Sequence, residues 1–334
     1  MNLTLKLLHV KKRIIMTKFK KYIEDIINGI PPTEERILKL LEEENLDILI
    51  AAANRIRKIF VKDRLHLCCA ISIKTGGCMQ NCSYCSQSGY YKTHVGNIGY
   101  EPEENIVKFS HINNNKNIGS IGLNSATGYY SELQKHNINA IVERIIKETN
   151  LKICAAYGIL KNEDEAKEIK ETGIYRYEHN LQTSENFFNN ICTTHSYIEK
   201  INTIKYAKKA GLKICSGGII GLGETFKDRI QMAFLLKKLN VKSIPINILN
   251  PVKGTPLAFG PIKLTKEEAL KTFAIFRIIL PDANIIFGAG RDFLKDMLPL
   301  AFKAGLNGIV VGNMLTNKGN EIEKDIEILR SSIT

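Results

Sequence analysis

The sequence has no stretch of about 18 uncharged apolar residues, and this absence excludes a membrane-spanning helix. Tryptophan is absent too, which by itself excludes no class of protein. Cysteine is sparse: eight residues in 334 are too few for a disulfide scaffold. Hydrophobic residues make up 44% and charged residues 24% of the chain, which excludes disordered and collagen-like classes. We therefore expect a globular, cytoplasmic protein.

The formal net charge is +13, a basic balance that suits nucleic acid, an acidic membrane surface or a phosphorylated ligand. The lysines are scattered, however, and do not form basic clusters with interleaved aromatic residues. Isoleucine, asparagine and lysine are frequent throughout, a bias that genomic base composition would also produce. We therefore expect neither a nucleic-acid partner nor a membrane partner.

Three regions are expected along the chain. Residues 1–16 carry a short apolar run and three clustered basic residues, without the longer apolar region and small-residue cleavage site of a secretory signal. We expect a disordered or spurious extension there, with Met16 as an alternative start. Residues 17–60 predict an N-terminal helical segment, and residues 61–334 a single domain.

Short apolar runs alternate with amphipathic stretches along this domain. The predicted strands span 67–73, 118–123, 151–157, 174–178, 212–220, 243–249, 284–289 and 307–312. The predicted helices include 131–148, 163–172, 196–210, 227–239, 266–280, 292–304 and 320–332, and several end at a glycine: Gly173, Gly211 and Gly305. Eight strands, each followed by a helix, favour a (β/α)8 TIM-type barrel over a doubly wound sheet. Active residues are then expected at the carboxyl ends of the strands.

Three cysteines follow the first predicted strand. Cys78, Cys82 and Cys85 have the spacing C-x3-C-x2-C, on a loop opened by two glycines. A structural zinc site normally has four ligands, often as two C-x2-C pairs, and no second pair is present. A cubane iron–sulfur cluster on three cysteines leaves one iron open for a small ligand. We interpret the triplet as a cluster site; the alternative is three buried, idle thiols.

With Tyr84 directly before its last cysteine, the triplet resembles the signature of the radical S-adenosylmethionine superfamily. The resemblance implies that the three cysteines hold a 4Fe-4S cluster. It also implies that the open iron chelates the amino and carboxylate groups of S-adenosylmethionine, and that Tyr84 lies near the adenine. The motif is specific for the cofactor and leaves the reaction open.

Six further segments resemble the biotin synthase family, and this similarity runs from about residue 40 to the C-terminus. They are residues 72–76, 177–184, 215–225, 243–247, 253–257 and 288–291. The resemblance implies a sulfurtransferase that converts dethiobiotin to biotin, the last step of biotin biosynthesis. A 5′-deoxyadenosyl radical would remove hydrogen from an unactivated carbon, which then captures sulfur from a second cluster. Reduced flavodoxin or ferredoxin would supply electrons, and the family analogy implies a homodimer.

The family's second cluster is usually 2Fe-2S, held by three cysteines and one arginine. Cys154 and Cys215, each in a Leu-Lys-Ile-Cys segment, match two of these ligands, and Arg291 matches the arginine. Without the resemblance, Arg291 would be interpreted as an anion-binding or salt-bridging residue, because a guanidinium stays protonated. The third cysteine position reads Ile121, so one ligand is missing.

Barrel geometry suggests a replacement for that ligand. Cys154 and Cys215 lie at equal depth on the third and fifth predicted strands, and interior layers draw side chains from alternate strands. The first strand carries Cys68 at similar depth. Our hypothesis is that Cys68 supplies the third thiolate and that the cluster type differs from the usual one. The alternative is that Cys68 and Cys69 are small core residues.

The resemblance also implies cofactor-binding residues. Asn180 and Gln182 would lie near the ribose of S-adenosylmethionine and the substrate, although the family position of Gln182 is commonly acidic. Lys200 would pair with the methionyl carboxylate as a point charge. The alternative for Lys200 is a solvated helix face.

For the substrate, the resemblance implies that Asn247 reads the ureido ring and that Thr316 and Asn317 receive the carboxylate. Cys192 matches no ligand and is expected to be structural, and His179 is given no role. Two rival functions stay open. One is another radical enzyme, of the hydrogenase-maturation or amino-acid-rearranging type. The other is an RNA-associated iron–sulfur or zinc protein.

Overall fold

The computed structural model describes residues 19–43, 45–95, 99–259, 264–312, 315 and 319–333. The expected extension of residues 1–16 and the predicted site residues Thr316 and Asn317 lie outside the described residues. Within the described ranges, no helix has both the length and the apolar character needed to cross a membrane.

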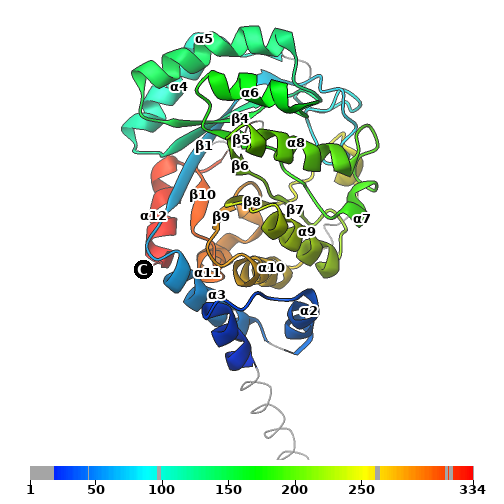
Figure 1. Cartoon of the computed structure of the whole chain (residues 1–334), viewed down its shortest axis with the longest axis vertical. Coiled ribbons are helices and arrows are strands. Elements are labelled where there is room, and N and C mark those ends of the chain that lie inside the picture. The colour runs from blue at the N-terminus through cyan, green and yellow to red at the C-terminus, as the bar shows by residue number, and fades with distance from the viewer. Residues whose placement is uncertain are drawn as a thin grey trace, which may run out of the picture.

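Eight parallel strands close into a barrel, which confirms the predicted (β/α)8 fold (Figure 1). Their order is β1, β3, β4, β5, β6, β8, β9 and β10, and β10 pairs with β1 to close the ring. Their bounds are His66–Thr75, Ser120–Ser125, Lys152–Ala156, Arg176–Glu178, Lys213–Cys215, Ser243–Ile248, Asn284–Phe287 and Gly308–Val310. Two short strands lie beside the ring: β2 (Gly99–Tyr100) is antiparallel to β1, and β7 (Gly218–Ile220) is parallel to β8.

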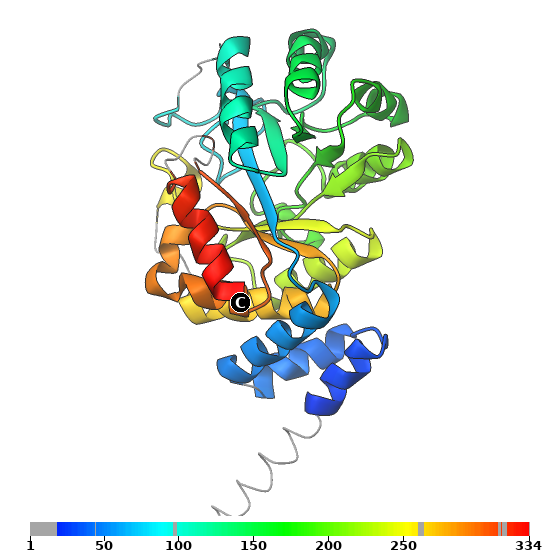
Figure 2. The same cartoon turned by 90° about the vertical axis from the view of Figure 1, so that its left-hand side faces the viewer.

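Helices cover the outside of the barrel (Figure 2). Their bounds are α4 (Glu103–Asn115), α5 (Glu132–Glu148), α6 (Glu163–Glu171), α7 (Glu185–Phe188), α8 (Tyr197–Lys209), α9 (Phe226–Lys238), α10 (Lys266–Ile279), α11 (Leu298–Lys303) and α12 (Ile322–Ile333). Local sequence explains several of their starts: α8, α9 and α10 each begin with a capping box, for example Ser196 with Glu199. The three glycines predicted to end helices all have positive φ.

Two predicted elements differ from the structure. The predicted helix 292–304 is two 3₁₀ turns (η2, Arg291–Phe293, and η3, Lys295–Met297) followed by α11, because Lys295 has a positive φ and Pro299 lies in the first turn of α11. The predicted strand 212–220 divides into β6 and β7. At the break, a Cβ on Gly217 would lie 1.8 Å from the Pro245 carbonyl oxygen, so the backbones approach too closely for any other residue. A third 3₁₀ turn, η1, spans Pro256–Ala258.

Three helical segments precede the barrel: residues 19–27, α2 (Glu34–Glu43) and α3 (Leu46–Phe60). The last of these packs against α10 and α11 (Figure 1). Beneath it the fully buried Arg277 donates to the carbonyls of Gly305 and Ala283 and to the Asn307 Oδ1, each within 2.9 Å. These acceptors precede β9 and β10, so one guanidinium ties the starts of two barrel strands together.

Candidate active site

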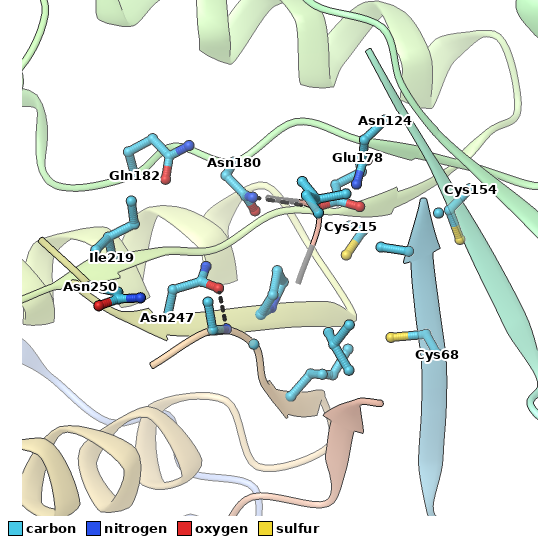
Figure 3. Close-up of a pocket in the computed structure, with 18 of the residues that line it drawn as sticks. Cys68, Asn124, Cys154, Glu178, Asn180, Gln182, Cys215, Ile219, Asn247 and Asn250 are labelled. Atoms are coloured by element: carbon cyan, nitrogen blue, oxygen red, sulfur yellow. Dashed lines mark hydrogen bonds between the residues drawn. The ribbon is translucent and has the colours of Figure 1, made fainter. Parts of the chain in front are cut away.

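A cavity of about 300 Å³ lies inside the barrel. Side chains from β1, β3, β4, β5, β6, β8, β9 and β10 line it, together with the loops that follow several of these strands. Figure 3 shows two groups of polar side chains on its wall. The thiols of Cys68, Cys154 and Cys215 form one group, and the amides of Asn180, Gln182, Asn247 and Asn250 form the other.

The structure brings Cys68 on β1, Cys154 on β4 and Cys215 on β6 to the same cavity. Burial raises the pKa of each thiol; neighbouring thiols raise it further for Cys68 and Cys215, and Arg176 opposes the rise for Cys154 and Cys215. The Ser243 hydroxyl donates a hydrogen bond to the Cys215 Sγ at 3.5 Å. Three buried thiols around one cavity form a donor set suited to a soft metal centre, which takes them as thiolates.

Two charged residues beside these thiols were not predicted. Arg176 on β5 donates from Nη1 to the Cys154 Sγ at 3.4 Å. Burial lowers its pKa, but Cys154, Cys215 and Cys68 raise it by more, so the net shift is upward. Glu178, on the same strand, is buried, which raises its pKa, and lies 3.5 Å from the Asn180 Nδ2. Their signal was the period of two in the predicted strand 174–178, which places Arg176 and Glu178 on the same face of the strand.

The positions of β3 that line the cavity are Gly122, next to Ile121, and Asn124. Ile121 pairs in register with Cys69 and Ile153, and all three side chains belong to the hydrophobic core. At Gly122, a Cβ would lie 3.7 Å from the Glu178 Oε2. This strand therefore contributes no thiol to the cavity, and the Glu178 carboxylate lies beside the place where one would project.

Arg291 makes a buried ion pair. Its Nη2 lies 3.0 Å from the Asp325 Oδ2 on α12, and its Nη1 donates to the Val310 carbonyl. The side chains are 5% and 0% exposed. Arg291 is not among the described residues that line the cavity, so the structure does not bring it together with the three thiols.

The cysteine loop follows β1. Gly76 and Gly77 both have positive φ, which turns the chain so that Cys78 donates its N–H to the Gln87 carbonyl at 3.0 Å. Cys85 and Tyr84 line the cavity. Burial raises the pKa of the Cys78 and Cys85 thiols. Of the predicted triplet, Cys85 thus reaches the cavity, whereas Cys78 and Cys82 are not among the described residues that line it.

Cys192 is not an isolated core residue. Its Sγ lies 3.6 Å from the Cys82 Sγ and 3.3 Å from the His195 Nδ1, and the ligand atoms of these three residues lie within 4.8 Å of one another. The hydrogen bond between the sulfurs lowers the pKa of Cys192 and raises that of Cys82. Sequence reasoning missed this contact, although the C-x2-H spacing of Cys192 and His195 was a signal for it.

The amide side chains on the cavity wall include Asn180 and Gln182, the two predicted cofactor-binding residues in the loop after β5. Asn180 accepts from the Gly217 N–H at 2.9 Å. Gln182 has a φ of +75°, and its buried Oε1 has no hydrogen-bond partner among the described residues. Asn247 is held on both sides, because its Nδ2 donates to the Gly218 carbonyl at 3.2 Å and its Oδ1 accepts from the Ala289 N–H at 2.8 Å.

Lys200 is 5% exposed and does not lie on a solvated helix face. Its Nζ is 3.5 Å from the Nε2 of the buried His179. Burial lowers its pKa to about 8, against the opposing effect of Cys82 and Cys192. Lys200 is thus a buried cation beside Cys82 and Cys192, and it is not among the described residues that line the cavity.

The chain is similar to known proteins along most of its length. A family model described as the radical SAM superfamily matches residues 72–236, and one described as the biotin and thiamin synthesis associated domain matches residues 245–332. A biotin synthase of Clostridium botulinum (strain Loch Maree / Type A3) is 42% identical over 316 residues, covering 95% of this chain and 98% of the relative. One of Carboxydothermus hydrogenoformans is 43% identical, covering 92% and 95%.

Two solved structures share the fold at low identity. Methylornithine synthase superposes with a TM-score of 0.78 at 19% identity, covering 93% of this chain and 95% of the other. A FeFe-hydrogenase maturase from Carboxydothermus hydrogenoformans has a TM-score of 0.77 at 17% identity, covering 98% and 81%. These likenesses concern the barrel alone.

Proposed function

Because this chain belongs to the biotin synthase family of radical S-adenosylmethionine enzymes, we propose that its barrel cavity is where sulfur is inserted into dethiobiotin. The enzyme is a sulfurtransferase that forms biotin. The observation that carries the placement is that three cysteines of the barrel strands line one cavity, which Tyr84 and Cys85 of the loop after β1 also line. The RNA-associated alternative has no comparable support.

The first set fits an iron–sulfur cluster. Cys78, Cys82 and Cys85 offer three soft donors on one loop. Burial raises the pKa of Cys78 and Cys85, and a bound metal centre would stabilise the thiolate forms that burial disfavours. These residues would hold the 4Fe-4S cluster, which when bound supplies the electron that cleaves S-adenosylmethionine to a 5′-deoxyadenosyl radical. The loop's own contribution is to fix the three sulfurs relative to the cavity.

Several side chains fit S-adenosylmethionine. Lys200 offers a desolvated positive charge to the methionyl carboxylate. The unpartnered Oε1 of Gln182 is an acceptor for a ribose hydroxyl. Gln182 takes the place of the acidic residue that is common at this position in the family. Asn180 and Tyr84 complete this wall of the cavity, with Tyr84 toward the adenine. These residues bind and orient the cofactor, and enclosure excludes water from the reaction.

The second set fits an auxiliary cluster, either 2Fe-2S or a variant, which when bound supplies the sulfur atom. We assign its thiolates to Cys68, Cys154 and Cys215. Arg176, which donates to the Cys154 Sγ, stabilises their negative charge in a buried environment. Arg291 stays the family-matched candidate for the arginine ligand of the auxiliary cluster, although its charge is already paired with Asp325.

Dethiobiotin would occupy the remaining space. Asn247 presents an amide held rigidly from both sides, which suits a cyclic urea. Thr316 and Asn317 would receive the substrate carboxylate. We further propose reduced flavodoxin or ferredoxin as electron donor, a homodimer in the cytoplasm, and a functional division into a helical segment at 17–60 and a catalytic barrel at 61–334.

Anaerobic reconstitution with iron and sulfide tests the assignment. Iron and sulfide are counted per chain, and the Mössbauer spectrum is recorded for the wild type and three variants. We expect more iron than one cubane holds in the wild type, and one cubane in Cys154→Ala/Cys215→Ala and in Cys68→Ala. The control is Cys69→Ala, which removes a buried thiol of the same strand; Cys69 also borders the cavity, but its Sγ donates to the Ser120 carbonyl at 3.7 Å.

The outcomes separate the proposals. A full complement of iron in Cys68→Ala would remove Cys68 from the ligand set. A single cubane in the wild type, unaffected by loss of Cys154 and Cys215, would leave no sulfur source in the barrel and would contradict the proposed cavity chemistry. Loss of iron in Cys69→Ala would show that folding rather than ligation is being measured.

A further inference from the structure

We propose that Glu178 is the fourth protein ligand of the auxiliary cluster and binds one of its irons through a carboxylate oxygen. The inference rests on the proposed ligation of this cluster by Cys68, Cys154 and Cys215. Clusters of the 2Fe-2S and 4Fe-4S types are held by four protein ligands, which need not all be cysteine. Three thiolates therefore leave one ligand to be supplied from the cavity wall.

Glu178 lies next to the thiols on the cavity-facing side of β5. Arg176, two residues earlier, donates to the Cys154 Sγ at 3.4 Å, so this face of the strand lies against the thiol group. Glu178 pairs in register with Cys215 on β6, and Figure 3 shows both side chains on the cavity wall. Among the described residues that line the cavity, Glu178 is the only one with a carboxyl group.

The carboxylate of Glu178 reaches toward the strand that carries no thiol. Gly122 on β3 pairs in register with Cys154 on β4, and a Cβ on Gly122 would lie 3.7 Å from the Glu178 Oε2. In the barrel, β3 lies between β4 and β1, the strand of Cys68. The side chain thus extends from β5, past Cys154, toward the strand that separates Cys154 from Cys68. A donor atom there lies on the side of the cavity where the missing thiolate would project.

The described part of the chain offers this carboxylate little compensation. Its Oε1 accepts one long hydrogen bond, from the Asn180 Nδ2 at 3.5 Å. The Oε2 atom has no hydrogen-bond partner among the described residues and is accessible from the cavity. A charged group in an enclosed space costs free energy unless an opposite charge or hydrogen bonds compensate it. Iron supplies that positive charge, and it binds carboxylate oxygen as well as thiolate sulfur.

His66 is the rival for the fourth position. It also lines the cavity, two residues before Cys68 on β1, and its Nε2 has no hydrogen-bond partner among the described residues. This nitrogen is buried in the wall, however, whereas the Glu178 Oε2 is accessible. The family-matched Arg291 is paired with Asp325 and is not among the described lining residues. The structure therefore favours Glu178.

The test isolates the auxiliary cluster in the full chain. Cys78→Ala/Cys82→Ala/Cys85→Ala removes the ligands of the loop cluster and serves as the background for every further variant. After anaerobic reconstitution, iron and sulfide are counted, the Mössbauer spectrum is recorded, and the rate of iron loss to a chelator is measured. In the background protein we expect one iron with a higher isomer shift than the others, because it has an oxygen ligand.

The variants at Glu178 separate a ligand from a structural residue. In Glu178→Gln we expect iron loss about tenfold faster and a changed spectrum for the iron of higher isomer shift. Glu178→Cys replaces the oxygen by a thiolate. It is expected to restore slow iron loss and to give a spectrum in which all irons have sulfur ligands only. Asn250→Ala is the matched control, because it removes a polar side chain from the amide-lined part of the same cavity, and it is expected to change neither readout.

The remaining outcomes overturn the inference. An unchanged spectrum and rate in Glu178→Gln would refute ligation by Glu178 and leave the proposed function standing. The same holds if His66→Gln loses iron and Glu178→Gln does not, since the fourth ligand is then His66. Equally fast loss from Glu178→Cys, or from Asn250→Ala, would show a disturbed cavity instead of a lost ligand. A background protein that binds no iron would refute the auxiliary cluster itself, and the inference with it.

Discussion

Replacing Arg291 by methionine is expected to destabilise the barrel through the carboxylate it leaves behind. Asp325 is fully buried on α12, and Arg291 is the cation that compensates it at 3.0 Å. Removing one partner of a buried ion pair typically costs about 3–5 kcal/mol, because the other charge stays desolvated. Asp325 keeps hydrogen bonds from the Gly312 N–H at 3.2 Å and the Asn320 Nδ2 at 2.9 Å. We therefore expect a loss at the lower end, about 3 kcal/mol.

A double-mutant cycle measures this coupling. Urea unfolding of the cluster-free chain, followed by far-UV circular dichroism, gives the free energy of unfolding for Arg291→Met, Asp325→Leu and the double variant. The double variant replaces both charges by apolar side chains, so it should be more stable than the sum of the single losses predicts, by about 2 kcal/mol. Additive losses, within about 0.5 kcal/mol, would refute the ion-pair reasoning.

The same residue is the family-matched ligand of the auxiliary cluster, and Arg291→Lys distinguishes the two roles. Lysine keeps the charge for Asp325 but loses the planar guanidinium. If the ion pair is the main role, the Mössbauer parameters of the auxiliary cluster stay unchanged in this variant. A changed spectrum with little loss of stability would show that Arg291 reaches the cluster, and our interpretation of the pair would be wrong.

Two further predictions concern the cavity wall. Burial, with Arg176 nearby, lowers the pKa of His66 to about 4 from 6.5, so the unfolded chain binds the extra proton between these pH values. The free energy of unfolding should therefore rise with pH from 4 to 6.5, by up to ~3 kcal/mol. Urea unfolding across this pH range should show that this rise is lost in His66→Gln. Parallel curves of unfolding free energy against pH for the wild type and the variant would contradict the prediction. In Gly288→Ala, the new Cβ would lie 2.1 Å from the Asn247 Oδ1 and displace that amide. The KM for dethiobiotin should rise about tenfold, the equivalent of one lost hydrogen bond, whereas Gly119→Ala, with only ordinary contacts, should leave it unchanged in the same steady-state assay.

The barrel was predictable because its signals are local. Apolar runs of five to seven residues between glycine-ended amphipathic stretches specify strand and helix without reference to the rest of the chain. The predicted strand 151–157 corresponds to β4 (Lys152–Ala156) for this reason. Where a distant segment decides the conformation, the prediction was wrong: the division of 212–220 at Gly217 depends on its approach to Pro245, on the neighbouring strand.

The candidate site was predictable to the same extent. Cys68 was predicted to face the cavity because it lies on the first strand at the depth of Cys154 and Cys215, the family-matched cysteines of the third and fifth strands, and interior layers draw side chains from alternate strands. The partners of Cys192 and Arg291 could not be found this way. The first lies across two loops, at Cys82, and the second on the last helix, at Asp325, so both contacts depend on how connecting segments fold back over the barrel.

The bonds that fasten residues 191–194 to the cysteine loop have a consequence for repair of the enzyme. Asn81 and Ser83 are held through amide, hydroxyl and carbonyl groups, none of which is a sulfur atom. Ordering a residue costs about 1–2 kcal/mol of backbone entropy, and here that cost is offset by contacts within the protein. We therefore expect iron to add little to the folding free energy, in contrast to small metal-dependent domains that unfold without their ion. We expect a chain that loses its cluster to oxygen to keep its cysteine loop folded, so that a new cluster can be assembled at the same site.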